Sequence, residues 1–182
     1  MSYKKFLKIV LKDYITVGAV TISSRYVVRK VMRELKPEHK CVIEYGGGNG
    51  ILTKEILKIL PADGRLIVVE LNDDFANELK QINDSRLKII HNDVFAVAKD
   101  FQQLGVNNVD AVISSVPLSL NSAAKRKELI KNTYKVIREQ GMFLVYQYSL
   151  LMLPELKKYF RNVRWNLELR NLLPYFIMVA EM

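Results

Sequence analysis

Apolar residues occur in seven short runs along the chain, and helix-like stretches separate most of these runs. The runs are rich in Val, Ile and Leu and cover residues 41–44, 66–70, 87–90, 111–114, 142–146, 163–167 and 175–180. Stretches with helical spacing cover about 51–60, 73–82, 95–103, 122–139 and 151–160. Nearly continuous apolar strands that alternate with helices indicate a parallel sheet with helices on both faces.

The last two runs are joined differently. Only the short turn Asn171–Pro174 separates residues 163–167 from 175–180, which leaves no room for a helix. Strands joined this closely pair antiparallel. The sequence therefore predicts an α/β fold of seven strands that closes with an antiparallel C-terminal hairpin.

Size and composition favour one domain. The chain has 182 residues and is 49% hydrophobic, enough for a sizeable single core. Its one cysteine, Cys41, allows no disulfide within the chain, so we expect a reducing compartment. Its two histidines have no ligand-like spacing with other donors, and we expect no metal site.

No uncharged apolar stretch approaches the roughly 20 residues that span a bilayer. The longest, 141–154, contains Gln147 and is better interpreted as a strand plus a loop. The N-terminus also lacks the apolar core and cleavage site of a signal peptide. We expect a soluble or peripheral membrane protein.

The net charge of +9 is concentrated near the N-terminus, where residues 1–40 hold ten basic and three acidic residues. Helical spacing would place Lys4, Lys8 and Lys12 in one stripe, with Lys5 beside it and apolar residues opposite. A basic amphipathic helix of this kind binds an anionic membrane surface. The alternative is an ordinary helix that packs on the domain.

Residues 44–50 read Glu-Tyr-Gly-Gly-Gly-Asn-Gly between an apolar run and a helix-like stretch. Glycines after a strand let a polar ligand approach the backbone and the first amides of the next helix. The loop lacks the Gly-Lys-Ser/Thr of a phosphate loop and the glycine spacing of a dinucleotide fingerprint. The alternative is a glycine turn that serves only chain reversal.

Two further acids follow predicted strands. Glu70 ends the second run, and Asn92 and Asp93 follow the third. In open α/β sheets the ligand lies beyond the carboxyl ends of the strands, so we expect these residues near the glycine loop. The alternatives are a helix-capping or surface acid for Glu70 and an ordinary turn for Asp93.

An acidic residue two positions before Gly46, followed by Gly48 and Gly50, resembles motif I of the class I S-adenosylmethionine-dependent methyltransferases. The resemblance implies their Rossmann-like seven-stranded sheet and S-adenosylmethionine (SAM) as cofactor. It also implies that Glu44 orients the glycine loop or the amino-acid end of SAM, and that Glu70 and Leu71 hold the ribose side. Asn92, Asp93 and Val94 would contact the adenine, and Ser115 would complete the cofactor site.

The fourth run is followed by Ser115-Val116-Pro117-Leu118. At this place adenine and cytosine N-methyltransferases carry Asn/Asp-Pro-Pro-Tyr or Asn-Ile/Leu-Pro-Tyr. In those enzymes the Asn or Asp side chain accepts a hydrogen bond from the base's amino group, and the aromatic ring stacks on the base. Serine and leucine supply neither group, which favours an aliphatic amine. The alternative is a rigid loop with no role in substrate choice.

A narrower resemblance is to the bacterial phospholipid N-methyltransferases, which convert phosphatidylethanolamine towards phosphatidylcholine. It rests on Val17-Gly18-Ala19-Val20, Ser23-Ser24, the glycine loop, Ser115–Leu118 and Gln147-Tyr148. The chain departs from that family at Ile22, Tyr45 and Ser149, where proline, a small aliphatic residue and threonine are usual. More distantly, the glycine loop and N-terminal flank resemble ribosomal RNA adenine N6-dimethyltransferases.

This resemblance implies Ser115, Pro117 and Tyr148 as catalytic residues that align a neutral amine with the sulfonium methyl. Tyr146 is a second candidate beside Tyr148, although either tyrosine can instead be a packed core residue. Gly18, Ser23 and Ser24 would belong to the substrate loop. Arg25 and Arg29, four residues apart on a helix that begins near Ser24, would hold the lipid phosphate or form a solvated face.

We therefore expect a monomeric phospholipid N-methyltransferase that is cytoplasmic and peripheral on the inner face of the cell membrane. A basic cap (residues 1–36) would precede the SAM-binding part (37–182). Nucleic acid is the less favoured partner. An RNA adenine N6-methyltransferase and a non-catalytic membrane or RNA adaptor are the alternative functions.

Overall fold

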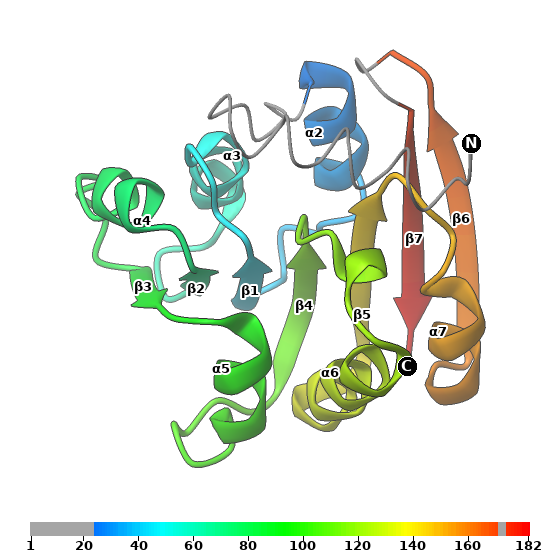
Figure 1. The fold of residues 1–182 in the computed structure, drawn as a ribbon. Coiled ribbons are helices and arrows are strands. Elements are labelled where there is room, and N and C mark those ends of the chain that lie inside the picture. The colour runs from blue at the N-terminus through cyan, green and yellow to red at the C-terminus, as the bar shows by residue number, and fades with distance from the viewer. Residues whose placement is uncertain (1–23, 171–173) are drawn as a thin grey trace.

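The computed structural model describes residues 24–170 and 174–182, which form one layered α/β fold (Figure 1). In chain order the elements are α2 Arg25–Met32, β1 Cys41–Tyr45, α3 Ile51–Ile59, β2 Arg65–Glu70, α4 Asp73–Leu79, β3 Leu87–His91, α5 Val94–Asp100, β4 Val109–Ser114, the 3-10 turn η1 Leu118–Leu120, α6 Ala123–Val136, β5 Ile137–Gln147, α7 Leu153–Tyr159, β6 Asn162–Glu168 and β7 Tyr175–Glu181. The basic stripe at Lys4, Lys5, Lys8 and Lys12 lies outside the described residues, as do Gly18 and Ser23.

The strands form one seven-stranded sheet in the order β3-β2-β1-β4-β5-β7-β6. Strands β1 to β5 are parallel to their neighbours, whereas β7 runs antiparallel to both β5 and β6. Figure 1 shows β4, β5 and β6 pointing one way and β7 the other. The predicted fold, including its antiparallel C-terminal hairpin, is confirmed.

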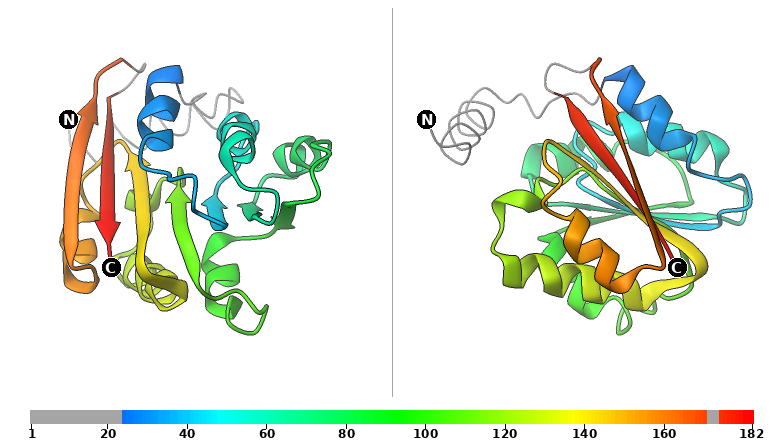
Figure 2. Two further views of the ribbon diagram at one scale, coloured as in Figure 1. Left: turned by 180° about the vertical axis from the view of Figure 1, so that it is seen from behind. Right: turned by 90° about the vertical axis from the view of Figure 1, so that its right-hand side faces the viewer.

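A core lies on each face of the sheet because successive strand residues point to opposite faces. In β1, Ile43 and Tyr45 belong to the core under α5, α6 and α7, and Val42 belongs to the core under α2 and α3. Figure 2 shows the two helix layers on opposite sides of the sheet. The second core underlies the glycine loop and therefore supports the site.

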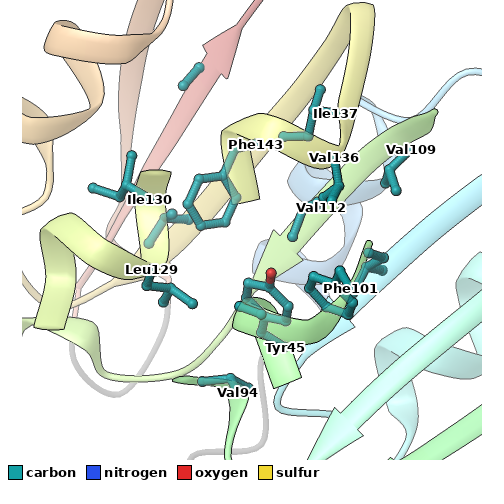
Figure 3. Packing of buried hydrophobic residues seen from close by; sticks show 14 of the residues in the cluster. Tyr45, Val94, Phe101, Val109, Val112, Leu129, Ile130, Val136, Ile137 and Phe143 are labelled. Carbon is teal, nitrogen blue, oxygen red and sulfur yellow. The ribbon is translucent and has the colours of Figure 1, made fainter. Parts of the chain in front are cut away.

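Tyr45 fills the first core with an aromatic ring (Figure 3). Its ring stacks on Phe101 with 6.1 Å between centroids and meets Phe143 edge-on at 6.2 Å. Its hydroxyl forms a 3.0 Å hydrogen bond with Thr133 of α6, and burial raises the pKa of Tyr45. The departure from a small aliphatic residue at this position is therefore accommodated by packing behind the glycine loop.

Helix α2 is fastened to the sheet by apolar packing and by two ion pairs near its C-terminal end. Ser24 caps it by accepting a hydrogen bond from the Val27 amide, and Val27, Val28 and Val31 enter the second core. Lys30 Nζ lies 3.0 Å from a Glu168 carboxylate oxygen of β6. Arg164, also on β6, donates a 3.0 Å hydrogen bond to Glu34 just after the helix. The division of the chain at residue 36 stays a prediction.

The predicted helix over 122–139 is too long. Helix α6 ends at Val136, and Ile137 already pairs with Val109 of β4. The chain then bends, with Gln140 at φ 65°, and a Cβ on Gly141 would lie 2.9 Å from the Val109 carbonyl oxygen. The close approach requires glycine at 141, and the pairing of Ile137 with Val109 requires extended backbone where the sequence suggested helix. Helices predicted to reach 82 and 103 likewise end at Leu79 and Asp100.

Candidate cofactor and substrate site

Loops that follow β1, β2 and β4 meet at the carboxyl edge of the sheet. The Gly46 amide donates a 2.8 Å hydrogen bond to the Val69 carbonyl of β2. The Ser115 amide donates one of 3.0 Å to the Tyr45 carbonyl, and the Asn92 amide donates one of 3.0 Å to the Glu70 carbonyl. The structure thus brings together the strand ends from which the sequence predicted a cofactor site.

The glycine loop is closed on one side and open on the other. Gly46, Gly48 and Gly50 have φ of 82°, 50° and 75°, values that disfavour other residues. A Cβ on Gly46 would lie 2.7 Å from the Ser115 hydroxyl, whereas a Cβ on Gly48 would meet nothing within 4 Å. The space over Gly48 therefore lets a ligand approach the backbone before α3.

Glu44 is a buried acid beneath this loop, only 1% exposed. One carboxyl oxygen, Oε2, accepts a 2.6 Å hydrogen bond from the Thr53 hydroxyl of α3. The other, Oε1, has no hydrogen-bond partner among the described residues. Burial, together with the nearby Glu70 carboxylate, raises the pKa of Glu44 to about 8. An unsatisfied buried acceptor suits a ligand that carries an N–H donor or an ammonium group.

Glu70 binds the glycine loop directly. Its Oε2 accepts a 2.9 Å hydrogen bond from the Gly48 amide, and its Oε1 accepts one of 2.9 Å from the Asn72 amide. A carboxylate oxygen has two lone pairs, so each oxygen keeps acceptor capacity for a ligand hydroxyl. Leu71 follows as a 65% exposed apolar side chain at the same edge.

Asp93 caps helix α5. One carboxylate oxygen, Oδ1, accepts a 3.0 Å hydrogen bond from the Phe95 amide. The Asn92 side chain accepts one of 2.7 Å from the Asp93 amide, and Val94 is buried in the first core. This cap holds Asn92 and Asp93 at the strand end beside Glu70, and their contact with the cofactor stays a prediction.

The loop after β4 turns its polar group inwards. The Ser115 hydroxyl donates to the Gly46 carbonyl at 2.8 Å and lies 3.2 Å from the Tyr45 carbonyl. Pro117 is exposed, whereas Leu118 is fully buried in the first core. This loop locks the glycine loop in place and presents no aromatic ring.

Three tyrosines gather where β5 meets β7. Tyr148 stacks on Tyr175 with 4.3 Å between ring centroids, and Tyr146 meets Tyr175 edge-on at 5.8 Å. Tyr146 is buried in the second core, in line with its alternative as a packed residue, whereas Tyr148 is partly exposed. Tyr175 is absent from the sequence-based candidates because only the strand register places it beside Tyr148.

Gln147 points to the opposite side of β5 from Tyr146, as strand alternation requires. Its side-chain oxygen accepts a 3.3 Å hydrogen bond from the Ser119 amide, and its nitrogen donates one of 2.8 Å to the Ser149 carbonyl. Gln147 therefore fastens the loop after β4 to the end of β5. In the sequence, only its place at the end of the fifth apolar run pointed to Gln147.

Helix α2 contributes basic groups beside this region. Arg25 and Arg29 are exposed, and Arg25 donates a 3.0 Å hydrogen bond to the Tyr26 hydroxyl. Within 24–170 and 174–182, no group of three potential ligands could hold a metal ion. No helix in the same ranges is long and apolar enough to cross a membrane.

Residues 16–147 match the family model described as ribosomal RNA adenine dimethylase. The chain belongs to this family. It is a SAM-dependent methyltransferase, with SAM as its cosubstrate. This family carries the name of the ribosomal RNA adenine dimethylases, which the sequence resembles more distantly.

Among curated proteins of similar sequence, the chain is 27% identical to the ornithine lipid N-methyltransferase of Singulisphaera acidiphila, over 93% of this chain and 90% of that protein. It is 37% identical to ribosomal RNA small subunit methyltransferase A of Pelagibacter ubique over 84 residues, 46% of this chain. That match spans 31% of the RNA enzyme's length.

Solved structures share the fold. The N-methyltransferase NodS of Bradyrhizobium japonicum superposes with a TM-score of 0.71 at 11% identity and covers 90% of this chain and 98% of its own. Precorrin-6y C5,15-methyltransferase of Geobacter metallireducens gives a TM-score of 0.69 at 16% identity, covering 90% and 91%. These likenesses establish the Rossmann-like methyltransferase fold of this family member.

Two glycines test where the cofactor approaches. Gly48 and Gly105 both have positive φ and open space where a Cβ would lie, but Gly105 lies in the turn after α5. Alanine at either position costs about 1 kcal/mol in stability from the strained backbone. We expect only Gly48→Ala to weaken SAM binding, by at least about tenfold, because its methyl group occupies the ligand's approach. Calorimetric titration and thermal unfolding of both variants check this, and equal SAM affinities would contradict it.

Proposed function

We propose that this methyltransferase transfers a methyl group to the primary aliphatic amine of a membrane lipid. The head groups with this chemistry are phosphatidylethanolamine and an ornithine lipid. The similarity to an ornithine lipid N-methyltransferase over nearly the whole of both chains supports a lipid amine. Phosphatidylethanolamine is the head group that the sequence resemblance favours.

The observation that carries the proposal is the loop after β4. Leu118 is aliphatic and 0% exposed, so it does not stack on a base. The Ser115 hydroxyl donates to the Gly46 carbonyl, and a serine has no amide oxygen to accept a hydrogen bond from a base's amino group. A planar nucleobase amine therefore lacks both of its usual contacts here, whereas an aliphatic amine requires neither.

The cofactor fits the site by the chemistry of its donors and acceptors. The unsatisfied Glu44 oxygen would accept from the ammonium of the amino-acid end, and Glu70 would accept from the ribose hydroxyls. The open backbone at Gly48, with Gly46 and Gly50 shaping the loop, would admit the ligand. Asn92, Asp93 and Val94 would surround the adenine, with Leu71 beside the ribose. Bound SAM supplies an already activated methyl group.

The chain's remaining task is to present a neutral amine in line with that methyl group. A lipid ammonium has a pKa of about 10.4, like lysine, and burial lowers it. Ser115 and Pro117 would shape the entry to the methyl group. The partly exposed Tyr148, stacked on Tyr175, would attract the positive charge that develops on the nitrogen as the methyl group is transferred. Arg25 and Arg29 would bind the lipid's acidic group.

RNA adenine methylation is the second candidate, and the family membership favours it. The chain matches only about a third of the length of the curated ribosomal RNA methyltransferases of Pelagibacter and Blochmanniella. These matches do not include the remaining two thirds or so of the two RNA enzymes.

Transfer of radiolabelled methyl from SAM separates these functions. Vesicles with phosphatidylethanolamine, vesicles with ornithine lipid and total RNA are offered separately. We expect label in at least one lipid, and the two vesicle types identify the head group. Label in RNA alone would overturn the proposal. SAM binding without label in any substrate would also contradict it and would favour an adaptor.

A further inference from the structure

An unusually apolar surface lies on the outer strands of the sheet. We name it the hairpin patch; it consists of Trp165, Leu167, Leu169 and Phe176. Trp165 is 46% exposed, Leu167 39% and Leu169 67%, and Phe176 is partly exposed. Leu167 pairs across the strands with Phe176, whose ring lies 5.9 Å from that of Trp165. Trp165, Leu167 and Phe176 share one face because alternate strand residues point the same way, and Leu169 follows directly after the strand.

The hairpin patch lies at the same edge of the sheet as the candidate site. Strands β5 and β6 both pair antiparallel with β7, so they run in the same direction. The carboxyl end of β6, with Leu167 and Leu169, therefore lies at the edge where β1, β2 and β4 present the cofactor loops (Figure 1). Tyr175, which stacks on the candidate catalytic Tyr148, begins the neighbouring strand.

Basic side chains border this end of the hairpin from the opposite face of the sheet, because Glu168 alternates with Leu167 and faces α2. Arg170 and Lys30 both pair with Glu168, so two cations share one carboxylate. The Arg170 guanidinium also lies 4.3 Å from the centre of the Tyr26 ring in α2. Arg25 and Arg29 follow on α2, and no described acid forms an ion pair with either. An apolar surface beside net positive charge is complementary to an anionic lipid bilayer.

We propose that the hairpin patch docks on an anionic bilayer and so holds the site's open edge against the membrane. This inference rests on the proposed lipid substrate, and it assigns the contact to the C-terminal hairpin. Leu167 and Leu169 enter the acyl boundary, Trp165 lies at the level of the head groups, and the basic border contacts lipid phosphates. The amine of a lipid in the same leaflet then has a short path to the methyl group.

Other occupants fit the surface less well. Trp165 and Phe176 offer ring faces to nucleic-acid bases, so RNA is the competing occupant, but the exposed Leu167 and Leu169 beside them favour an acyl boundary. Exposed charged residues, Arg161 just before and Arg164 within the edge strand β6, disfavour pairing of a second copy along that edge. Both alternatives have distinct outcomes in the experiment below.

The chain contains a single tryptophan, so its fluorescence reports on the patch alone. The full chain is mixed with vesicles of phosphatidylglycerol and phosphatidylcholine, which carry no primary amine and separate docking from methyl transfer. We expect a blue shift of Trp165 emission and quenching by brominated acyl chains. Co-sedimentation without a change in emission would overturn the proposal, and so would failure to bind. A shift that depends on protein concentration without vesicles would overturn it in favour of a second copy.

Leu169→Glu tests the contact, and Leu104→Glu, at a 48% exposed leucine after α5, is the matched control. We expect Leu169→Glu to reduce vesicle affinity at least tenfold while SAM affinity and thermal stability stay unchanged. Equal vesicle affinities would overturn docking through the patch. RNA binding that only Leu169→Glu abolishes, without vesicle binding, would assign the patch to RNA and overturn the proposal.

Methyl transfer to the same lipids in detergent micelles is measured in parallel and needs no bilayer contact. Docking that Leu169→Glu abolishes, with no lipid methylated in micelles or vesicles, would support the patch and reject the proposed substrate. Methylation in micelles, with no vesicle binding through the patch, would support the proposed substrate and reject docking through the patch. The two proposals can therefore fail independently.

Discussion

Replacement of Glu70 by alanine is expected to lower the affinity for SAM by about 100-fold. The proposed contacts are charge-assisted hydrogen bonds to two ribose hydroxyls, each contributing about 1.5 kcal/mol, and 1.4 kcal/mol is a factor of ten. The substitution also frees the Gly48 amide, which Glu70 holds at 2.9 Å. The loop that receives the ligand therefore loses an anchor together with an acceptor.

Calorimetric titration with SAM measures this change. Asp73→Ala, which removes an acid three residues later that is 86% exposed in its side chain, is the matched control and should bind normally. Comparing S-adenosylhomocysteine with methylthioadenosine tests the ribose separately, because Glu70→Ala should weaken both ligands similarly. Undiminished affinity in Glu70→Ala would mean that Glu70 serves only the loop.

Glu44→Gln is expected to flatten the fall in stability between about pH 5 and pH 8. Folded Glu44 keeps its proton up to about pH 8, whereas an ordinary glutamate releases it near 4.5. Between these values the folded state binds more protons than the unfolded state, so the free energy of unfolding falls as pH rises. The contribution is full below pH 4.5 and is lost through pH 8. Its size is on the order of a few kcal/mol.

Urea unfolding of both proteins at several pH values measures this difference without SAM. The glutamine can still accept the Thr53 hydrogen bond, but it cannot ionise. The wild-type protein should therefore lose stability relative to Glu44→Gln as the pH rises to 8. Thr53→Val offers a second check, because it removes the hydroxyl that favours the charged form of Glu44. In this variant the loss of stability should occur at a higher pH than in the wild-type protein. Parallel pH profiles for the wild type and Glu44→Gln would contradict a protonated Glu44.

The strands were predictable from sequence because most are buried on both faces and read as continuous apolar runs. The boundary between α6 and β5 was not, since Ile137 fits the apolar face of a helix equally well. Only its pairing with Val109, a contact between segments far apart in the chain, decides for a strand. Local patterns carry no information on such pairings.

The glycine loop and its acids were predictable because parallel strands bring their carboxyl ends to one edge. Their contacts within the folded chain were not. The sequence suggested the substrate-side role of Ser115, but not that its hydroxyl binds the Gly46 carbonyl. Tyr175 becomes a neighbour of Tyr148 only through the register of β5 and β7. The roles assigned to these residues stay predictions until the variants are measured.

The ion pairs that fasten α2 to β6 also constrain the order of folding. An eight-residue helix is marginal alone, and its partner residues lie about 130 positions later in the chain. During synthesis α2 leaves the ribosome early but cannot gain Glu168 or Arg164 until β6 has been made. The basic border of the site is therefore assembled among the last parts of the molecule, after the cofactor loops that it adjoins.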